Sequence, residues 1–210
     1  MRAGRLITLE GGEGAGKSTL LQGLRAHLET YGIEPVLTRE PGGTPLGEVV
    51  RTLVLDPAHA DICAEAELLL MFAARAQLVR TCLQPQLKAG HWVICDRFTD
   101  ASYAYQGAGR GQPFERIATL EHWATQDLQP DLTFLLDLPV EQGQARIVGR
   151  GPSDRIEREP LVFFAEVRAA YRARAAAFPE RFCVLDASLP SEQVLAAASA
   201  EIDRRWRDWQ

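Results

Sequence analysis

Residues 11–18 read GGEGAGKS and match the spacing G-x-x-x-x-G-K-[ST] at every fixed position. Glycines at these points allow the backbone to curl until successive N–H groups face one anion. The Lys17 ammonium can reach the outer phosphates of a nucleoside triphosphate, and the Ser18 hydroxyl can bind Mg²⁺. An apolar run at 5–10 predicts a strand before this phosphate loop, and leucine spacing predicts a helix that begins near Lys17. The segment is therefore predicted to bind a nucleoside triphosphate; the alternative is a glycine-rich turn without a ligand.

Lysine and asparagine usage narrows the class of nucleotide-binding protein. Of the 23 lysine and arginine residues only Lys17 and Lys88 are lysines, so a compact ammonium stands at position 17 of an arginine-rich chain. The sequence contains no asparagine, so it cannot form the Asn-Lys-x-Asp segment with which Ras-type GTPases read guanine. ATPase motors are usually longer or carry further modules. A small P-loop kinase is therefore favoured, and such an enzyme needs an acceptor pocket and cations around the transferred phosphoryl group.

Charged residues also follow two other predicted strands. Asp96 and Arg97 end the apolar run 91–95, and Arg39 follows the run 34–38. Ligands bind at the carboxyl edge of an open parallel sheet, so these side chains are predicted to face one site. A carboxylate there can hold Mg²⁺ through water, while an arginine can fork onto phosphate oxygens. The alternative for Asp96 and Arg97 is an ion pair that caps a strand.

An aromatic ring and a guanidinium share one face of a predicted long helix at 64–89. Phe72 and Arg75 are three residues apart, which places them side by side on a helix. The ring could stack on a pyrimidine while the guanidinium donates to a carbonyl of the base. From spacing alone, however, Phe72 is better explained as a core residue.

The elements that must position these groups alternate between strands and helices. Apolar runs predict strands at 5–10, 34–38, 91–95, 132–138 and 182–186. Helical spacing predicts helices at 17–31, 46–54, 64–89, 114–127, 140–148, 160–177 and 190–207. This order predicts an α/β fold of the three-layer P-loop NTPase type, in which a five-stranded parallel sheet is flanked by helices. The polar stretch 149–159 has almost no apolar periodicity and is predicted to be a mobile loop.

Composition limits domain number, compartment and partners. At roughly 150 residues per domain, 210 residues predict a single domain over 1–210. No stretch approaches about 18 apolar residues without a charge, so no membrane span is expected. A net charge of −5 gives no basic footprint for nucleic acid. The widely spaced Cys63, Cys82, Cys95 and Cys183 are expected to be reduced thiols, and the N-terminal region resembles no signal peptide. A cytoplasmic protein is predicted.

Several motifs together resemble the bacterial thymidylate kinase family. They are LEGGEGAGKS at 9–18, REPGGT at 39–44, FAARAQ at 72–77, DRFTDASYAYQG at 96–107 and GRGPSDRIE at 149–157, in the order of the family and over nearly the whole chain. The resemblance implies an enzyme that makes dTDP from dTMP with ATP and Mg²⁺, a step toward dTTP for DNA replication. It also implies a homodimer built by packing the long helices, for which the sequence offers excess apolar surface at 64–79.

The resemblance also implies roles for individual residues. ATP binding is implied for Gly11, Gly12, Glu13, Gly14, Ala15, Gly16, Lys17, Ser18, Thr19, Arg146 and Arg150. Binding of dTMP is implied for Glu13, Arg39, Pro41, Phe72, Arg75, Arg97, Ser102, Tyr105 and Gln106. Mg²⁺ would be held by Ser18 and Asp96, and the catalytic residues would be Lys17, Arg97, Arg150 and Glu13. Arg75 would contact O4 of thymine, Tyr105 would crowd the 2′ position, and Glu13 would lie near the 3′-hydroxyl.

The family divides by where its catalytic arginine lies. In one group the phosphate loop carries that arginine after an acidic residue, but this chain has Glu13-Gly14 at the corresponding positions. The segment at about 147–159 contains several arginines and resembles the lid of the other group, which closes over ATP. Arg150 is therefore expected to reach the transferring phosphoryl group; the alternative is a solvated basic loop.

Two other functions stay open at this point. The chain could be a P-loop kinase for a different nucleotide or a small metabolite, or a nucleotide-dependent switch or regulatory subunit without acceptor chemistry. A nucleoside monophosphate already presents a charged oxygen, because its second pKa is about 6, so its phosphorylation needs no general base. Kinases that act on hydroxyls generally need a carboxylate, but Asp96 could serve as one and so does not separate these classes.

Overall fold

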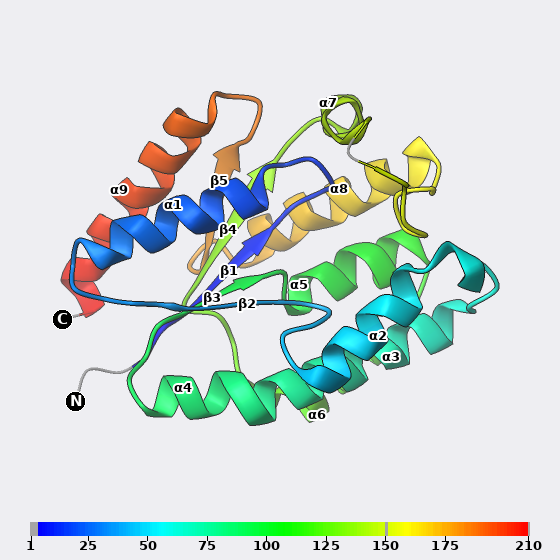
Figure 1. Ribbon diagram of the computed structural model, residues 1–210, viewed down its shortest axis with the longest axis horizontal. Helices are drawn as coiled ribbons and strands as arrows, with labels where there is room; N and C mark the ends of the chain where they lie inside the picture. Colours follow the sequence, from blue (N-terminus) through cyan, green and yellow to red (C-terminus); the bar gives the residue numbers. More distant parts are fainter. Residues whose placement is uncertain (1–3, 150, 210) are drawn as a thin grey trace.

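The structure is a computed structural model in which residues 4–149 and 151–209 are described (Figure 1). Its described part contains one sheet, formed by β1 (Leu6–Glu10), β2 (Val36–Arg39), β3 (Val93–Asp96), β4 (Leu132–Asp137) and β5 (Phe182–Asp186). All neighbouring strands are parallel, and their order is β2-β3-β1-β4-β5. The predicted five-stranded parallel sheet is therefore confirmed.

Helices cover both faces of the sheet (Figure 1). They are α1 (Lys17–Glu29), α2 (Pro45–Leu55), α3 (Ala64–Leu78), α4 (Gln84–Lys88), α5 (Thr99–Ser102), α6 (Phe114–Thr125), α7 (Val140–Ile147), α8 (Leu161–Ala177) and α9 (Ser191–Trp209), with a 3₁₀ turn η1 (Pro57–His59) and π-helical turns η2 (Val79–Leu83) and η3 (Tyr103–Gly109). Ile7 and Leu9 of β1 pack with α1 and α9, whereas Leu6 points to the opposite face and packs with the end of α3 and with η2. This alternation follows from the two-residue period of a strand.

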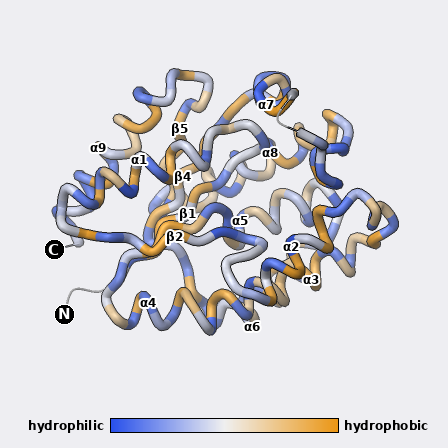
Figure 2. Tube along the Cα trace, in the orientation of Figure 1, coloured by the Kyte–Doolittle hydropathy of each residue, from blue (hydrophilic) through white to orange (hydrophobic). Residues whose placement is uncertain are grey.

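The hydropathy of each element matches its place in the layers. Figure 2 shows hydrophobic residues along the central strands and mixed hydropathy along the surrounding helices. Among the described residues, no helix has the combination of length and apolar character that a membrane span requires. The cysteines Cys63, Cys82, Cys95 and Cys183 form no disulfide with one another.

The centre of the sheet is where its connections reverse direction. The chain leaves β1 for β2 and β3 on one side, and then crosses to β4 and β5 on the other. Leu9 of β1 and Arg39 of β2 are both in register with Asp96 of β3, so these strands end at the same edge. In open α/β sheets the crevice at such a reversal is where ligands bind. The fold therefore brings the phosphate loop, Asp96 and Arg39 to one edge.

Two segments differ from the prediction. The helix predicted over 64–89 is interrupted by the π-helical turn η2 between α3 and α4. Pro85 lies in the first turn of α4, and because proline has no N–H to donate and crowds the preceding turn, the hydrogen-bond ladder changes there.

No helix was predicted between 97 and 113, where the structure has α5 followed by η3. Every residue from Thr99 to Gly107 is buried, so this segment has no polar face that alternates with an apolar one. A helix that is buried on all sides gives no amphipathic period, and that period is the signal on which sequence prediction depends.

Candidate active site

The phosphate loop curls back over the start of α1. Gly16 precedes the helix with φ 93°, and Gly14 has φ 70° and lies so close to Gly143 that an added Cβ would come within 2.3 Å of the Gly143 carbonyl oxygen. A side chain is therefore excluded at position 14 by both conformation and space. No side chain caps the N-terminus of α1 among the described residues. The first backbone N–H groups of α1, with the positive end of the helix dipole, form a ready site for phosphate oxygens.

Lys17 is held against the phosphate loop by backbone carbonyls. Its ammonium donates to the carbonyl oxygens of Gly11 at 3.1 Å and Gly12 at 2.9 Å, and the residue is only 8% exposed. Burial, helped by nearby Arg97, lowers the pKa of Lys17. The loop therefore fixes its own cation before any ligand arrives.

Arg97 forms the second cation of the site and is largely covered by protein. It donates to Glu13 Oε1 at 2.7 Å, to the Gly11 carbonyl at 2.8 Å and to the Tyr171 hydroxyl at 3.1 Å, and its guanidinium lies 4.8 Å from the centre of the Tyr105 ring. Its φ of 69° is left-handed, a conformation that non-glycine residues rarely adopt and that is often found at functional sites. The structure thus brings Arg97, Glu13 and Tyr105 together.

The neighbours of the half-buried Glu13 favour its ionised form. Burial favours its neutral form, but Arg97 and Lys17 outweigh this effect and lower the pKa of Glu13. The Tyr105 hydroxyl donates to the same carboxylate oxygen as Arg97, at 2.9 Å. The group of side chains therefore offers both a fixed positive charge and a fixed acceptor beside the phosphate loop.

Glu10, at the end of β1, holds two of the groups that lie next to Arg97. It is fully buried and accepts hydrogen bonds from the Phe98 backbone N–H and the Tyr171 hydroxyl, both at 2.7 Å. Burial, helped by Asp100, raises the pKa of Glu10 to about 8. Sequence reasoning missed Glu10 and Tyr171; the signal for Glu10 was a carboxylate inside an apolar strand directly before the loop.

A cavity of about 280 Å³ opens between the phosphate loop, α2 and η3. Its lining includes the sequence-predicted Glu13, Gly14, Ala15, Gly16, Lys17, Ser18, Thr19, Arg39, Pro41, Asp96, Arg97, Tyr105 and Gln106. It also includes residues that sequence reasoning missed, namely Glu40, Arg51, Leu55, Met71, Ala101, Asp154 and Ile156. We refer to it as the arginine cavity, because Arg39, Arg51 and Arg97 all line it.

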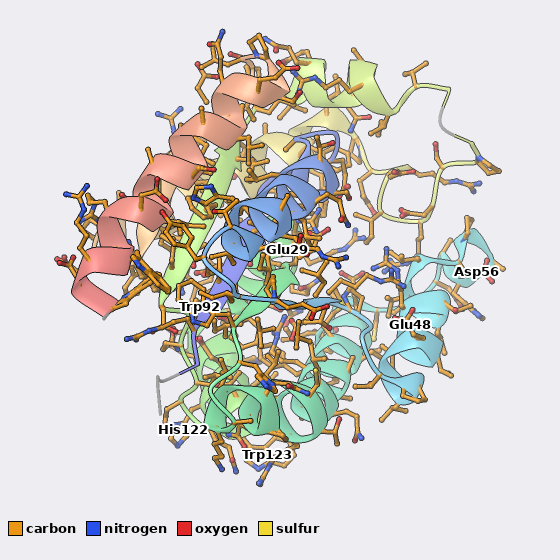
Figure 3. All side chains as sticks on the ribbon, turned by 60° about the vertical axis from the view of Figure 1, so that its left-hand side comes forward. Glu29, Glu48, Asp56, Trp92, His122 and Trp123 are labelled. Carbon is orange, nitrogen blue, oxygen red and sulfur yellow. The ribbon has the colours of Figure 1, made fainter. Side chains whose placement is uncertain are left out.

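Two of these arginines are oriented by neighbouring groups. Arg51 of α2 donates to the Pro41 carbonyl at 3.1 Å, and burial, together with Arg39, lowers the pKa of Arg51. Arg39 donates to Glu48 of α2 at 2.8 Å, and Glu48, which is labelled in Figure 3, also accepts from the Gly43 N–H. Arg51 was missed because, in an arginine-rich chain, nothing local marks one helical arginine as a ligand.

Three predicted contacts to the base do not line the arginine cavity. Phe72, Arg75 and Ser102 are buried, and Arg75 is only 2% exposed. The Arg75 guanidinium donates to Glu40 Oε2 at 2.7 Å and Ser102 Oγ at 2.9 Å, and lies 4.5 Å from the centre of the Phe72 ring. The structure therefore brings the three together beside the cavity, and the hydrogen bonds of Arg75 are already made to protein groups.

A second cavity, of about 540 Å³, lies on the other side of the phosphate loop. We call it the β5-loop cavity, because the residues after β5, from Ala187 to Leu195, form much of its lining. Arg146 also lines it and donates to the Ala187 carbonyl at 3.0 Å. The two cavities share Gly14, Ala15, Gly16 and Thr19. They therefore meet at the point where the loop would hold phosphates.

The segment at about 147–159, which we call the lid segment after its predicted role, contains the predicted catalytic arginine. Arg150 lies outside the described residues. The described residues after it form turns rather than a helix, and Asp154 and Ile156 line the arginine cavity. Arg155 is buried and donates from its backbone to the Leu55 carbonyl at 2.8 Å and from Nε to the Val54 carbonyl at 2.7 Å. This segment is thus attached to the end of α2.

Comparison with known proteins identifies the family. The family model described as thymidylate kinase matches residues 9–198. The thymidylate kinase of Chromohalobacter salexigens is 55% identical over 211 residues, covering 100% of both chains, and that of Pseudomonas putida is 54% identical, covering 96% of this chain and 94% of the other. The crystal structure of thymidylate kinase from Ehrlichia chaffeensis has a TM-score of 0.80 at 30% identity and covers 95% of this chain and 99% of that one. The chain therefore belongs to the thymidylate kinase family, whose reaction is the phosphorylation of dTMP to dTDP.

Proposed function

We propose that this chain transfers the γ-phosphoryl group of ATP, in the presence of Mg²⁺, to the phosphate of dTMP, a step toward dTTP for DNA replication. The observation that carries the proposal is the meeting of two cavities at one phosphate loop. The arginine cavity is lined by Arg39, Arg51 and Arg97, which suit a monophosphate. The β5-loop cavity, lined by Arg146 and the loop after β5, has room for a base and ribose. Donor and acceptor phosphates would meet in line between them.

The donor is proposed to occupy the β5-loop cavity and the phosphate loop. The loop N–H groups from Gly11 to Thr19 would bind the phosphates, and Lys17 would neutralise charge on the outer ones. Arg146 is exposed toward the β5-loop cavity while fixed to Ala187, which supports a role beside the base or ribose of ATP.

Mg²⁺ is proposed to bind between Asp96 and Ser18. Asp96 Oδ1 is buried and has no hydrogen-bond partner among the described residues, and both side chains line the arginine cavity. No three His, Cys, Asp or Glu side chains of the described residues converge on a metal position. This donor set fits Mg²⁺, which typically takes one or two carboxylates together with substrate phosphates and water. A bound cation there would neutralise charge on the donor phosphates.

The acceptor phosphate is proposed to bind Arg39, Arg51 and Arg97. All three line one cavity, and guanidinium groups match the geometry of phosphate oxygens. The phosphate of dTMP is already charged at neutral pH, because its second pKa is about 6. No side chain has to remove a proton, and positioning with charge stabilisation suffices.

The nucleoside of dTMP is proposed to lie between Tyr105, Gln106 and the Pro41 turn. Tyr105 is held by Glu13, so its ring is fixed where it would crowd a ribose 2′-hydroxyl, and the Glu13 carboxylate would face the sugar 3′-hydroxyl region. Phe72, Arg75 and Ser102 would form the adjoining wall, from which Arg75 would donate to O4 of thymine. In the structure the Arg75 guanidinium already donates hydrogen bonds to three protein acceptors, so this contact requires a local rearrangement on binding.

We further propose that the chain acts as a single domain over 1–210 with a mobile lid at about 147–159, in the cytoplasm. Its four free cysteines suit a reducing compartment. Arg150 of the lid is proposed to contact the transferring phosphoryl group. The phosphate loop itself has no arginine to supply this charge.

A homodimer is proposed to form through α3 and α6. An apolar groove of about 320 Å³ is lined there by Leu68, Leu69 and Leu120, and Leu69 is 57% exposed. Trp123 of α6 is also exposed (Figure 3). Light scattering should give the mass of two chains, and Leu69→Arg should reduce it to one, whereas Val162→Arg, at an exposed apolar position on α8, should not. A wild-type mass of one chain would refute the dimer.

The proposed reaction is tested with a panel of nucleoside monophosphates. With ATP and Mg²⁺, we expect dTMP to be phosphorylated with the highest kcat/KM among dTMP, dCMP, UMP and GMP, and chelation of the metal should abolish turnover. A preference for dCMP, UMP or GMP would indicate another P-loop kinase. Binding of ATP without affinity for dTMP would indicate a switch or regulatory protein.

A further inference from the structure

Glu67 of α3 collects several hydrogen bonds although it lies outside the arginine cavity. It is only 1% exposed. Its Oε1 accepts from Gln106 Nε2 at 2.8 Å, its Oε2 accepts from Arg155 of the lid segment at 2.5 Å, and Arg110 lies 3.3 Å from Oε2. One buried carboxylate therefore joins η3, the lid segment and the residue after η3.

The charge of Glu67 decides which way the Gln106 amide is turned. Both Glu67 oxygens face N–H donors, Oε1 that of Gln106 and Oε2 those of the two arginines, so the side chain acts here as a hydrogen-bond acceptor. Gln106 must therefore offer it the NH₂ group. The other end of the amide, Oε1, is buried and has no hydrogen-bond partner among the described residues, while Gln106 lines the arginine cavity. A residue in the cavity wall therefore carries a buried acceptor that lacks a donor.

The hydrogen-bonding edge of thymine carries the kind of donor that Gln106 Oε1 lacks. Thymine carries N3–H, which donates, whereas N3 of cytosine accepts and would face the Gln106 oxygen with no hydrogen between them. A buried acceptor left unpaired is costly, so the orientation of this amide discriminates between the two bases. A glutamine free to turn could satisfy either base and would discriminate less.

We propose that Glu67 is a positioning residue that fixes the Gln106 amide with its oxygen toward N3–H of the acceptor base, and so selects thymine over cytosine. The proposal rests on the proposed function, since it takes dTMP as the acceptor. Arg155 comes from the lid segment and also binds the end of α2, so the charge on Glu67 is fully compensated only while that segment is attached there.

The test compares dTMP with 5-methyl-dCMP, which keeps the methyl group and changes only the hydrogen-bonding edge. The measured quantity is the ratio of their kcat/KM values. Glu67→Gln should lower this ratio about ten-fold, because one neutral amide facing another allows Gln106 to turn. Gln106→Leu should also lower it, and adding Glu67→Gln to Gln106→Leu should have no further effect. Glu159→Gln is the control, because Glu159 pairs with Arg110 but does not contact Gln106.

Each outcome separates this inference from a structural role and from the proposed function. A merely structural Glu67 would lower both kcat/KM values equally, so a ratio within two-fold of wild type in folded Glu67→Gln would overturn the inference. If that variant does not fold, Arg155→Met decides: its ratio should fall several-fold, less than for Glu67→Gln, because Arg110 still compensates the charge, and an unchanged ratio would overturn the inference. Failure of the wild-type protein to phosphorylate dTMP would instead refute the proposed function.

Discussion

Replacing Lys17 with alanine should lower kcat/KM for ATP by about a thousand-fold. The ammonium is held by two loop carbonyls directly beside the helix N-terminus, so it would meet the donor phosphates as an already ordered group. Arginine at this position should not restore activity, because a planar guanidinium needs more space than a compact ammonium in a buried setting.

Lys88→Ala supplies the control, since Lys88 is the other lysine of the chain and is exposed on α4. Steady-state assays at saturating dTMP should give wild-type kinetics for it, and thermal unfolding should show that both variants are folded. Near-normal turnover of Lys17→Ala would contradict the assignment of the phosphate loop.

Arg150→Ala should lower kcat by about a thousand-fold while changing the KM for dTMP little. Charge spreads over the phosphoryl group as it transfers, so a guanidinium brought by the lid contributes more in the transition state than in the ground state. Glu13-Gly14 leaves the phosphate loop without an arginine that could compensate for the loss.

Arg158→Ala tests whether position or mere positive charge matters. Arg158 lies in the same segment, is exposed and donates only weakly to the Ser153 carbonyl, at 3.3 Å, so its loss should change kcat by less than about ten-fold. If Arg150→Ala instead raised the KM for dTMP and left kcat unchanged, Arg150 would be a binding residue and the catalytic cation would have to lie elsewhere.

The order of elements and the phosphate loop were determined by the sequence itself. Alternating apolar runs and amphipathic segments predict a parallel sheet because each strand must be covered on both faces, and the predicted strand at 182–186 agrees with β5 residue for residue. The loop was recognisable because its function depends on neighbouring residues in one short motif: glycines that curl the backbone, then Lys17, then Ser18. Local interactions leave local patterns, so both could be predicted.

Which arginines line the cavity, and what orients them, was decided only by the tertiary structure. In the sequence nothing distinguishes Arg51 from other helical arginines, and only the fold brings the Pro41 carbonyl to it. The fold likewise gives Arg75 its hydrogen-bond acceptors on Glu40 and Ser102. Glu67 contacts residues that lie 39 and 88 positions away in the chain. The charge state and orientation of a buried polar group depend on partners brought in from distant segments, and no spacing along the sequence encodes which partners those are.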